Sequence, residues 1–201
     1  MTHPVRRHMP LWLKLAFSLW ILFWAPAVAI QVGNQNFLWL CNLANFLLLI
    51  GLWSESRLLI SMQWLATALV GTFWALDAGT AWVTGWHPIG GTEYMFNAAT
   101  PLGVRLLSLY HLILPLVAGF GVCRLGYNPR ALLWQTAVTW LAVATAYRFT
   151  DPVRNVNWVQ GPFGITQDWF APGLYMALLM MAWPLLLYLP VHLVTRRRLS
   201  Q

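Results

Sequence analysis

Six runs of mostly apolar residues divide the chain, and segments richer in polar and charged residues separate them. The runs cover roughly 11–30, 37–53, 58–77, 103–122, 131–149 and 172–194. Each approaches the length of about 17–25 residues that an α-helix needs to cross about 30 Å of hydrocarbon. The pattern therefore predicts an all-α fold, a polytopic bundle of about six transmembrane helices that forms a single domain over residues 1–201.

The links between these runs differ in length. Those after the first, second and fourth runs are short, whereas the links at 78–102 and 150–171 are long. Helices joined this closely belong to one bundle, and the chain shows no repeat, low-complexity tract or soluble domain. We therefore expect a functional site within the helices or in the two long links.

Composition supports the membrane assignment and explains the charge. Charged residues make up 8% of the chain and hydrophobic residues 59%, whereas soluble domains carry about 25% charged residues. The net charge of +7 would suggest a nucleic-acid partner for a soluble protein, but here its distribution reports orientation. If the N-terminus is cytoplasmic, nine of the twelve basic residues lie inside: Arg6, Arg7, Lys14, Arg57, Arg124, Arg130, Arg196, Arg197 and Arg198.

The positive-inside rule therefore predicts cytoplasmic N- and C-termini in the cell's inner (plasma) membrane. Membrane lipids are the expected partners, nucleic acid is not, and the sequence names no protein partner. The outer side would hold Arg105, Arg148 and Arg154 with both long links. The first run also has the Ala-x-Ala end of a secretory signal at Ala29, although a polytopic protein can keep such a segment as an uncleaved span.

The cysteines and histidines indicate neither a disulfide nor a metal. Cys41 falls near the outer end of the second run and Cys123 at the inner end of the fourth. A disulfide needs a Cα separation of about 4.4–6.8 Å, so both are expected to be free thiols. The spacing shows no zinc pattern, and a haem on His111 would need a second histidine at matching depth, unlike His87 or His192. We expect no metal and no cofactor.

Polar side chains open the second run. In "LCNLANF", Cys41 and Asn45 are four residues apart and share a helix face, with Asn42 about 100° away. Asparagines inside membrane helices often stabilise packing by about 0.6–2 kcal/mol across a helix interface, and a buried cysteine is usually inert. Each residue alone therefore has a structural interpretation.

The fourth run carries "SLYHLILP". Ser108 lies one turn before His111, and Pro115 follows four residues later. Because proline lacks an N–H, the His111 carbonyl loses its helical partner and the helix can kink there. A histidine beside a freed carbonyl is a candidate site, and a simple hydrogen bond across the bundle is the alternative.

These residues share one side of the predicted membrane. Cys41 and His111 both lie near the outer end of their spans, and Asp77, Arg105 and Arg148 lie at outer span ends. The link at 154–164 is expected to fold back over the mouth of the bundle with Asn155, Asn157 and Trp158. The unusual polar chemistry is thus predicted to form one outer pocket, on one side of the membrane only.

The motifs "LWLCNLANFLLLIGLW", the histidine of the fourth run, "NVNWVQGP" and "APGLYMALLMMAWPLLLYLP" resemble those of the bacterial YwaF-like integral membrane proteins. The similarity runs loosely over residues 37–190 and extends to eukaryotic transmembrane phospholipid acyltransferases. More distantly, the arrangement resembles the androgen-induced lipid hydrolases, which pair a threonine and a histidine. The resemblance implies Cys41 as nucleophile and His111 as its base, with Asn157 and Trp158 in the outer motif.

Two functions remain open from the sequence. The first is a thiol-dependent lipid acyltransferase or hydrolase of the outer leaflet, in which Cys41 attacks an ester and His111 moves the proton. The expected supporting residues are oxyanion donors from Asn42, Asn45 or Asn157, and Asp77 or Arg148 to orient His111 or hold a phosphate. The second is a non-catalytic binder, transporter or scaffold for a small lipophilic ligand or a partner protein.

Overall fold

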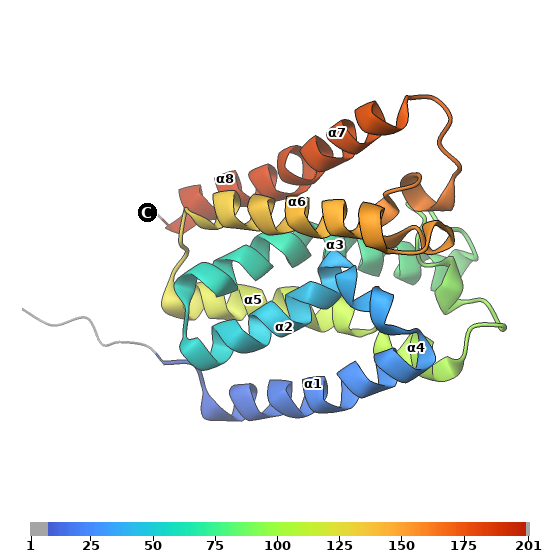
Figure 1. Ribbon diagram of the computed structural model, residues 1–201. Coiled ribbons are helices and arrows are strands. Elements are labelled where there is room, and N and C mark those ends of the chain that lie inside the picture. Colours follow the sequence, from blue (N-terminus) through green and yellow to red (C-terminus); the bar gives the residue numbers. More distant parts are fainter. Residues whose placement is uncertain (1–7, 200–201) are drawn as a thin grey trace, which may run out of the picture.

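A computed structural model describes residues 8–199 (Figure 1). Arg6 and Arg7, which contribute to the predicted charge asymmetry, lie outside the described residues. The regular structure of the described chain is helical throughout, which confirms the all-α prediction. Its α-helices are α1 (Leu11–Gln31), α2 (Leu40–Ser54), α3 (Arg57–Thr84), α4 (Leu102–Leu107), α5 (Tyr110–Leu125), α6 (Ala131–Phe149), α7 (Pro172–Ala182) and α8 (Leu189–Leu199).

The helices form a bundle of six rods. Helices α4 and α5 make one continuous rod, and a π-helix at Trp183–Tyr188 joins α7 to α8. Successive rods run in opposite directions, so the two long links lie at one end of the bundle and the described ends of the chain at the other (Figure 1). We call these the link end and the termini end.

Four rods are long and apolar enough to cross a membrane: Leu11–Gln31, Arg57–Thr84, Leu102–Leu125 and Pro172–Arg198. Helix α2 is apolar but has only 15 residues. Helix α6 has 19 residues but is interrupted by polar ones, Gln135 and Thr139 among them. The structure therefore supports a membrane protein, with four rods that meet the requirements of a span.

Two helix boundaries differ from the sequence prediction. The run expected to begin a helix at residue 37 begins instead with a 3₁₀ turn, Asn34–Leu38, and α2 starts at Leu40. Helix α3 continues about two turns beyond residue 77 and ends at Gly85, which adopts the left-handed conformation with φ 74°. A glycine in this conformation is a common C-terminal cap of a helix. Asp77 therefore lies inside α3 and does not end it.

Helix α3 is the centre of the bundle and packs against α2, α5 and α6. On its α1 side, Trp24 is fully buried and contacts Phe37, Phe46 and Tyr110 edge to face, at ring-centroid distances of 5.9, 5.7 and 5.5 Å. Aromatic pairs of this geometry stabilise by about 0.5–1.5 kcal/mol beyond their buried area. This cluster therefore holds α1 and the start of α2 against the tyrosine that precedes His111.

The backbones of α3 and α5 approach closely at Gly71. A Cβ on this glycine would lie 2.6 Å from the carbonyl oxygen of His111 and 2.8 Å from Pro115 Cγ. Pro115 deprives that carbonyl of its helical hydrogen bond, and the Cα–H of Gly71 is placed to contact it weakly. The position of His111 thus depends on residue 71 of the neighbouring helix being a glycine.

At the termini end, Glu55 joins α1 to the α2–α3 turn. Its carboxylate accepts hydrogen bonds from Lys14 Nζ at 2.7 Å, the Met9 backbone N–H at 3.2 Å and His8 Nδ1 at 2.7 Å. The hydrogen bonds from Lys14 and then His8 lower the pKa of Glu55 from 4.5 to about 2. The carboxylate therefore stabilises this corner in its ionised form.

We expect the hydrogen bonds and ion pairs of Glu55 to lose their stabilising effect in acid. Because folding lowers the pKa of Glu55, its contribution is complete above pH 4.5 and is lost as the pH falls from about 4.5 to about 2. Glu55→Gln should cost about 1 kcal/mol at pH 7 and flatten the dependence of the unfolding temperature on pH in that window. Glu93→Gln is the control, because Glu93 is exposed and accepts only from the Gly91 N–H; equal effects of the two changes in thermal unfolding would contradict this assignment.

The Gly71 contact predicts a second stability effect. Gly71→Ala places a methyl group against backbone, so it should lower stability by about 1–3 kcal/mol, measured as the thermal unfolding temperature in detergent. Gly79→Ala in the same helix is the matched control, since a Cβ there meets nothing within 4 Å and alanine favours helix. An unchanged unfolding temperature for Gly71→Ala would show that the two helices are not held by this contact.

Candidate functional site

The start of α2 is fixed by a residue from the far end of the chain. Asn157 is fully buried, with φ 55°. Its Nδ2 donates to the Leu38 carbonyl at 2.8 Å, and its Oδ1 accepts from the Leu40 N–H at 2.9 Å. The second long link therefore caps α2 one residue before Cys41, using the free N–H that begins every helix.

Cys41 lies in the first turn of α2 and is half-buried. Its side-chain hydrogen-bonding partner is the Tyr110 hydroxyl, while the neighbouring Asn42 N–H donates to the Trp39 carbonyl at 2.9 Å. The Tyr110 O–H donates to Asn42 Oδ1, so its oxygen remains available to accept the thiol hydrogen. The thiol thus has a tyrosine as its side-chain partner in the first turn of α2.

His111 has a fixed ring and a defined tautomer. Its Nδ1 lies 2.8 Å from the Ser108 carbonyl oxygen, which can only accept, so Nδ1 carries the hydrogen and the neutral ring has its lone pair on Nε2. The ring stacks between Tyr110, at a centroid distance of 4.2 Å, and Trp74, at 5.2 Å. This arrangement presents Nε2 as a base.

Cys41 and His111 face one small cavity. Thr67, Val70 and Gly71 of α3 form another wall. The cavity offers about 10 Å³, which is close to the space one water molecule occupies. Among the described residues no direct hydrogen bond joins the Cys41 sulfur to the His111 ring. The structure therefore brings the two predicted catalytic residues to the same cavity, with no hydrogen bond between them among the described residues.

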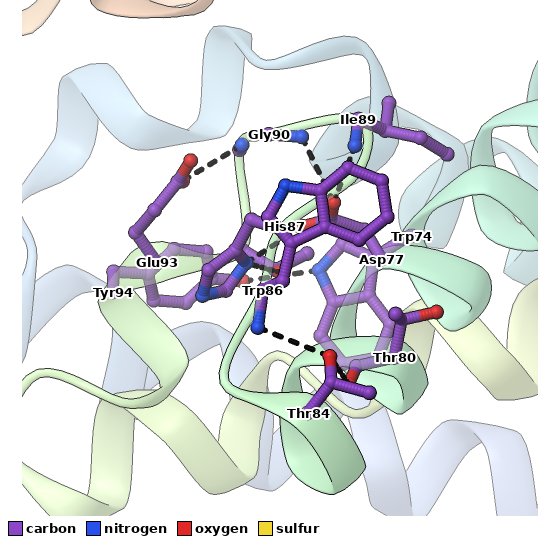
Figure 2. A network of polar contacts seen from close by, with 12 residues as sticks. Trp74, Asp77, Thr80, Thr84, Trp86, His87, Ile89, Gly90, Glu93 and Tyr94 are labelled. Atoms are coloured by element: carbon purple, nitrogen blue, oxygen red, sulfur yellow. Dashed lines mark hydrogen bonds and ion pairs between the residues drawn. The ribbon is translucent and has the colours of Figure 1, made fainter.

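Asp77 organises the first long link (Figure 2). Its Oδ1 accepts from the backbone N–H groups of Ile89 at 2.8 Å and Gly90 at 2.9 Å. Its Oδ2 accepts from the Thr92 hydroxyl and from His87 Nδ1, which is 3.0 Å away. Asp77 thus orients His87, and among the described residues no hydrogen bond joins it to His111, the role expected from the sequence.

The link that Asp77 holds also reaches toward His111. Tyr94 follows Thr92 by two residues and accepts a hydrogen bond from Trp74 Nε1 at 3.3 Å (Figure 2), and Trp74 stacks on His111. Sequence reasoning missed His87, Thr92 and Tyr94 as part of this region. The sequence signal was the Gly-Gly pair at 90–91, which permits a tight turn around an upstream carboxylate.

The amides proposed as oxyanion donors already have partners. Asn42 Nδ2 donates to the Asn36 carbonyl at 2.7 Å. Asn45 is fully buried, accepts from Trp20 Nε1 at 3.1 Å and donates to the Cys41 carbonyl at 3.4 Å. With Asn157 bound to the start of α2, all three side chains stabilise the local backbone. The simpler interpretation of these residues, helix packing, is the one their hydrogen bonds support.

The predicted arginines and serine lie apart from the thiol. Arg105 donates to the Met95 carbonyl at 3.4 Å, and the Ser108 hydroxyl donates to the Val104 carbonyl at 3.0 Å. Arg148 is exposed over the Phe149 ring, 5.6 Å from its centroid. His111 is therefore oriented by the Ser108 carbonyl, with no contribution from Arg148 among its described contacts.

The remaining predicted residues of the second long link hold that link together. Asn155 donates to the Gly161 carbonyl at 2.7 Å and accepts from the Gln160 N–H at 2.8 Å. Trp158 stacks on Trp183 with ring centroids 5.7 Å apart. The Trp158 carbonyl accepts from Tyr175 at 2.6 Å, so the link is fastened to α7 as well as to α2.

Buried polar residues also occur toward the termini end, so the prediction of one-sided polar chemistry is wrong. Gln135 and Thr139 of α6 meet Tyr188, whose hydroxyl lies 2.8 Å from the Thr139 oxygen. At the α5–α6 turn, the Tyr127 hydroxyl lies 2.7 Å from His192 Nδ1, and burial raises the pKa of Tyr127 to about 12. The π-helix therefore makes polar contacts with α6, and α8 with the α5–α6 turn, that the apolar pattern concealed.

No family model, curated protein or solved structure matches the chain. The resemblance drawn from the short motifs therefore stays a prediction, and the geometry alone carries the functional argument.

We predict that the Asp77 carboxylate keeps the first long link ordered. Asp77→Asn replaces one carboxylate oxygen by an NH₂ that cannot accept, so one pair of hydrogen bonds must break. Amide hydrogen exchange of residues 85–95 should speed up by at least about tenfold, equivalent to about 1.4 kcal/mol of local stability. Asp168→Asn, in the other long link and exposed, should leave exchange there unchanged; unaltered exchange in Asp77→Asn would show that the carboxylate does not hold the link.

Proposed function

We propose that the protein is a multi-pass inner (plasma) membrane protein with six spans, cytoplasmic termini and an outer-side site. The support for this proposal is physical. Four rods have the length and composition of a span, and both long links lie at the opposite end from the termini (Figure 1). Arginines concentrate at the termini end, with Arg57, Arg124, Arg130 and Arg196 among the described residues, as the positive-inside rule requires of a cytoplasmic face.

Within this bundle we propose a thiol-dependent acyl transfer on a lipid ester, with Cys41 as nucleophile and His111 as general base. One observation carries the proposal: the Cys41 thiol and the His111 ring, with Nε2 as its free base, line the same cavity. A separation bridged by one water is within the range in which a base can take a proton, and the cavity has the size of one water.

The proposed reaction balances with these two residues. His111 Nε2 takes the thiol proton directly or through the bridging water, and the Cys41 sulfur attacks the ester carbonyl. Collapse of the tetrahedral intermediate forms a thioester and expels the lipid alcohol, which takes the proton from His111. Water or the hydroxyl of a second lipid then attacks the thioester, so the products are a fatty acid or a newly acylated lipid.

An ester must displace part of the cavity wall, because the cavity holds about one water. Tyr94 belongs to the short 3₁₀ turn Glu93–Met95 and not to a long rod. It also accepts a hydrogen bond from Trp74, whose ring stacks on His111. We therefore place the substrate's approach on the side of the first long link, whose displacement disturbs no span.

The alternative is a non-catalytic binder or scaffold, and one observation favours it. The Cys41 thiol has Tyr110 as its side-chain partner, not His111. A thiol that keeps this partner is a packing group. Direct measurement of thiol reactivity separates the two functions.

The test is the labelling rate of Cys41 by N-ethylmaleimide in a Cys123→Ser background, which removes the exposed second thiol. Because His111 supplies the base, His111→Gln should slow labelling at pH 7 by about 10²-fold or more, the lower end of general-base effects. Tyr127→Phe is the matched control, since it removes the partner of the other buried histidine, His192, at the far end.

Equal labelling rates with and without His111 would contradict the proposed base. If His111→Gln does not yield monodisperse protein, the labelling rate of the wild-type protein is measured against pH, which tests the base without a variant. That profile should show the titration of a base below the ordinary range of a thiol, and a rate that simply follows an unperturbed thiol would also contradict the proposal.

A further inference from the structure

A second, larger cavity lies on the opposite side of the bundle between α6 and the α7–α8 rod. It has a volume of about 350 Å³, within the range of ligand-binding pockets. We call it the α6–α8 groove, and its lining residues are Leu132, Leu133, Thr136, Trp140, Met181, Pro184, Leu185 and Leu189. It shares no residue with the cavity of Cys41 and His111.

The groove presents an apolar surface despite two polar residues in its wall. The Thr136 hydroxyl donates to the Leu132 carbonyl at 2.8 Å, so its hydrogen is occupied. Trp140 Nε1 donates at 2.8 Å to the Met180 carbonyl, which lacks a helical partner because Pro184 follows four residues later. A hydrocarbon chain therefore suits the groove, and hydrogen-bonding groups on a ligand would find no free donor there.

The groove is open to the surroundings of the bundle. Leu133 of α6 is 69% exposed and Leu185 of the α7–α8 rod is 49% exposed. Both residues line the groove. In a membrane this opening faces acyl chains. A proline and a π-helix keep the α7–α8 rod from packing as a regular helix here, which explains why the groove is not filled by side chains.

Positive charge stands at one end of the groove. Arg130 precedes Leu132 by two residues at the start of α6 and is exposed. Arg196 follows Leu189 by seven residues, two turns later on the same face of α8, and is also exposed. The ion pairs of the described residues use Lys14, His8 and His87, so neither arginine is neutralised by a carboxylate.

We propose that the α6–α8 groove binds an anionic glycerophospholipid of the inner leaflet. One acyl chain lies along Leu185 and Leu189 in the groove, and the phosphate lies between Arg130 and Arg196. Arginines at the cytoplasmic end of a gap between membrane helices attract such headgroups, and the apolar lining accepts the chain. The α6 side of the groove, from Leu132 to Trp140, is the half of that helix nearest the termini end, so this lipid is a structural or regulatory ligand and not the substrate at Cys41.

The wild-type protein provides the first test. In nanodiscs, phosphatidylglycerol with a photoreactive diazirine in one acyl chain should label peptides covering residues 132–140 and 181–189. The phosphatidylcholine analogue should label them less, and salt should reduce the difference. Labelling spread evenly over other lipid-facing rods, such as α1 with its exposed Leu19 and Leu22, would overturn the site. Equal labelling by both lipids would overturn the headgroup assignment.

Variants then separate headgroup from groove. Arg130→Gln and Arg196→Gln should each weaken phosphatidylglycerol labelling about fivefold, and together about 25-fold, while Arg148→Gln at the other end of α6 should not. Leu185→Trp should fill the groove and reduce labelling by both lipids. If the arginine changes act but Leu185→Trp does not, the lipid is only attracted to the surface and the groove is not its site. Cys41→Ala should leave all these results unchanged, which keeps this test independent of the proposed catalysis.

Discussion

The contact between the backbones of α3 and α5 at Gly71 is the constraint on which the site depends. With no side chain on Gly71, the carbonyl that Pro115 leaves free approaches α3 closely. The same turn of α5 carries His111, whose ring is then confined between Trp74 of α3 and Tyr110. A protein interior transmits such a constraint because it is closely packed. Displacement of one helix would move the base, its stacking partners and the cavity wall together.

The two long links act on this core in the same physical way. In each case one buried polar side chain satisfies backbone groups that have no partner in a regular helix. Asp77 projects from α3 and gathers the N–H groups of the first link. Asn157 projects from the second link and binds the start of α2. The links therefore position Cys41 and Tyr94 as firmly as the spans position His111, although they are the segments with the least regular structure.

The sequence predicted the parts of this structure that depend on local pattern. All six apolar runs are helical, because length and hydrophobicity alone decide whether a segment can form such a rod. The sequence could not assign partners, because these depend on how each helix is rotated and on contacts over long sequence separations. Asn157 meets Leu40 across 117 positions, and Asp77 meets His87 because α3 runs past the position where its apolar run seemed to end. Gln135 and Thr139 were concealed because isolated polar residues hardly change the character of an apolar run.

The arrangement around Cys41 also bears on how such a thiol could be both stable and reactive. At rest the thiol has Tyr110 as its side-chain partner, and the Tyr110 hydroxyl donates to Asn42. The base that lines the same cavity is held in the tautomer that can accept a proton, but among the described residues it makes no hydrogen bond to the thiol. A group that enters the cavity must displace what fills it and compete with Tyr110 for the thiol. Part of the binding energy would then be used to move the thiol from Tyr110 to His111. A ligand can shift the equilibrium between these two arrangements only if it binds one of them more tightly than the other.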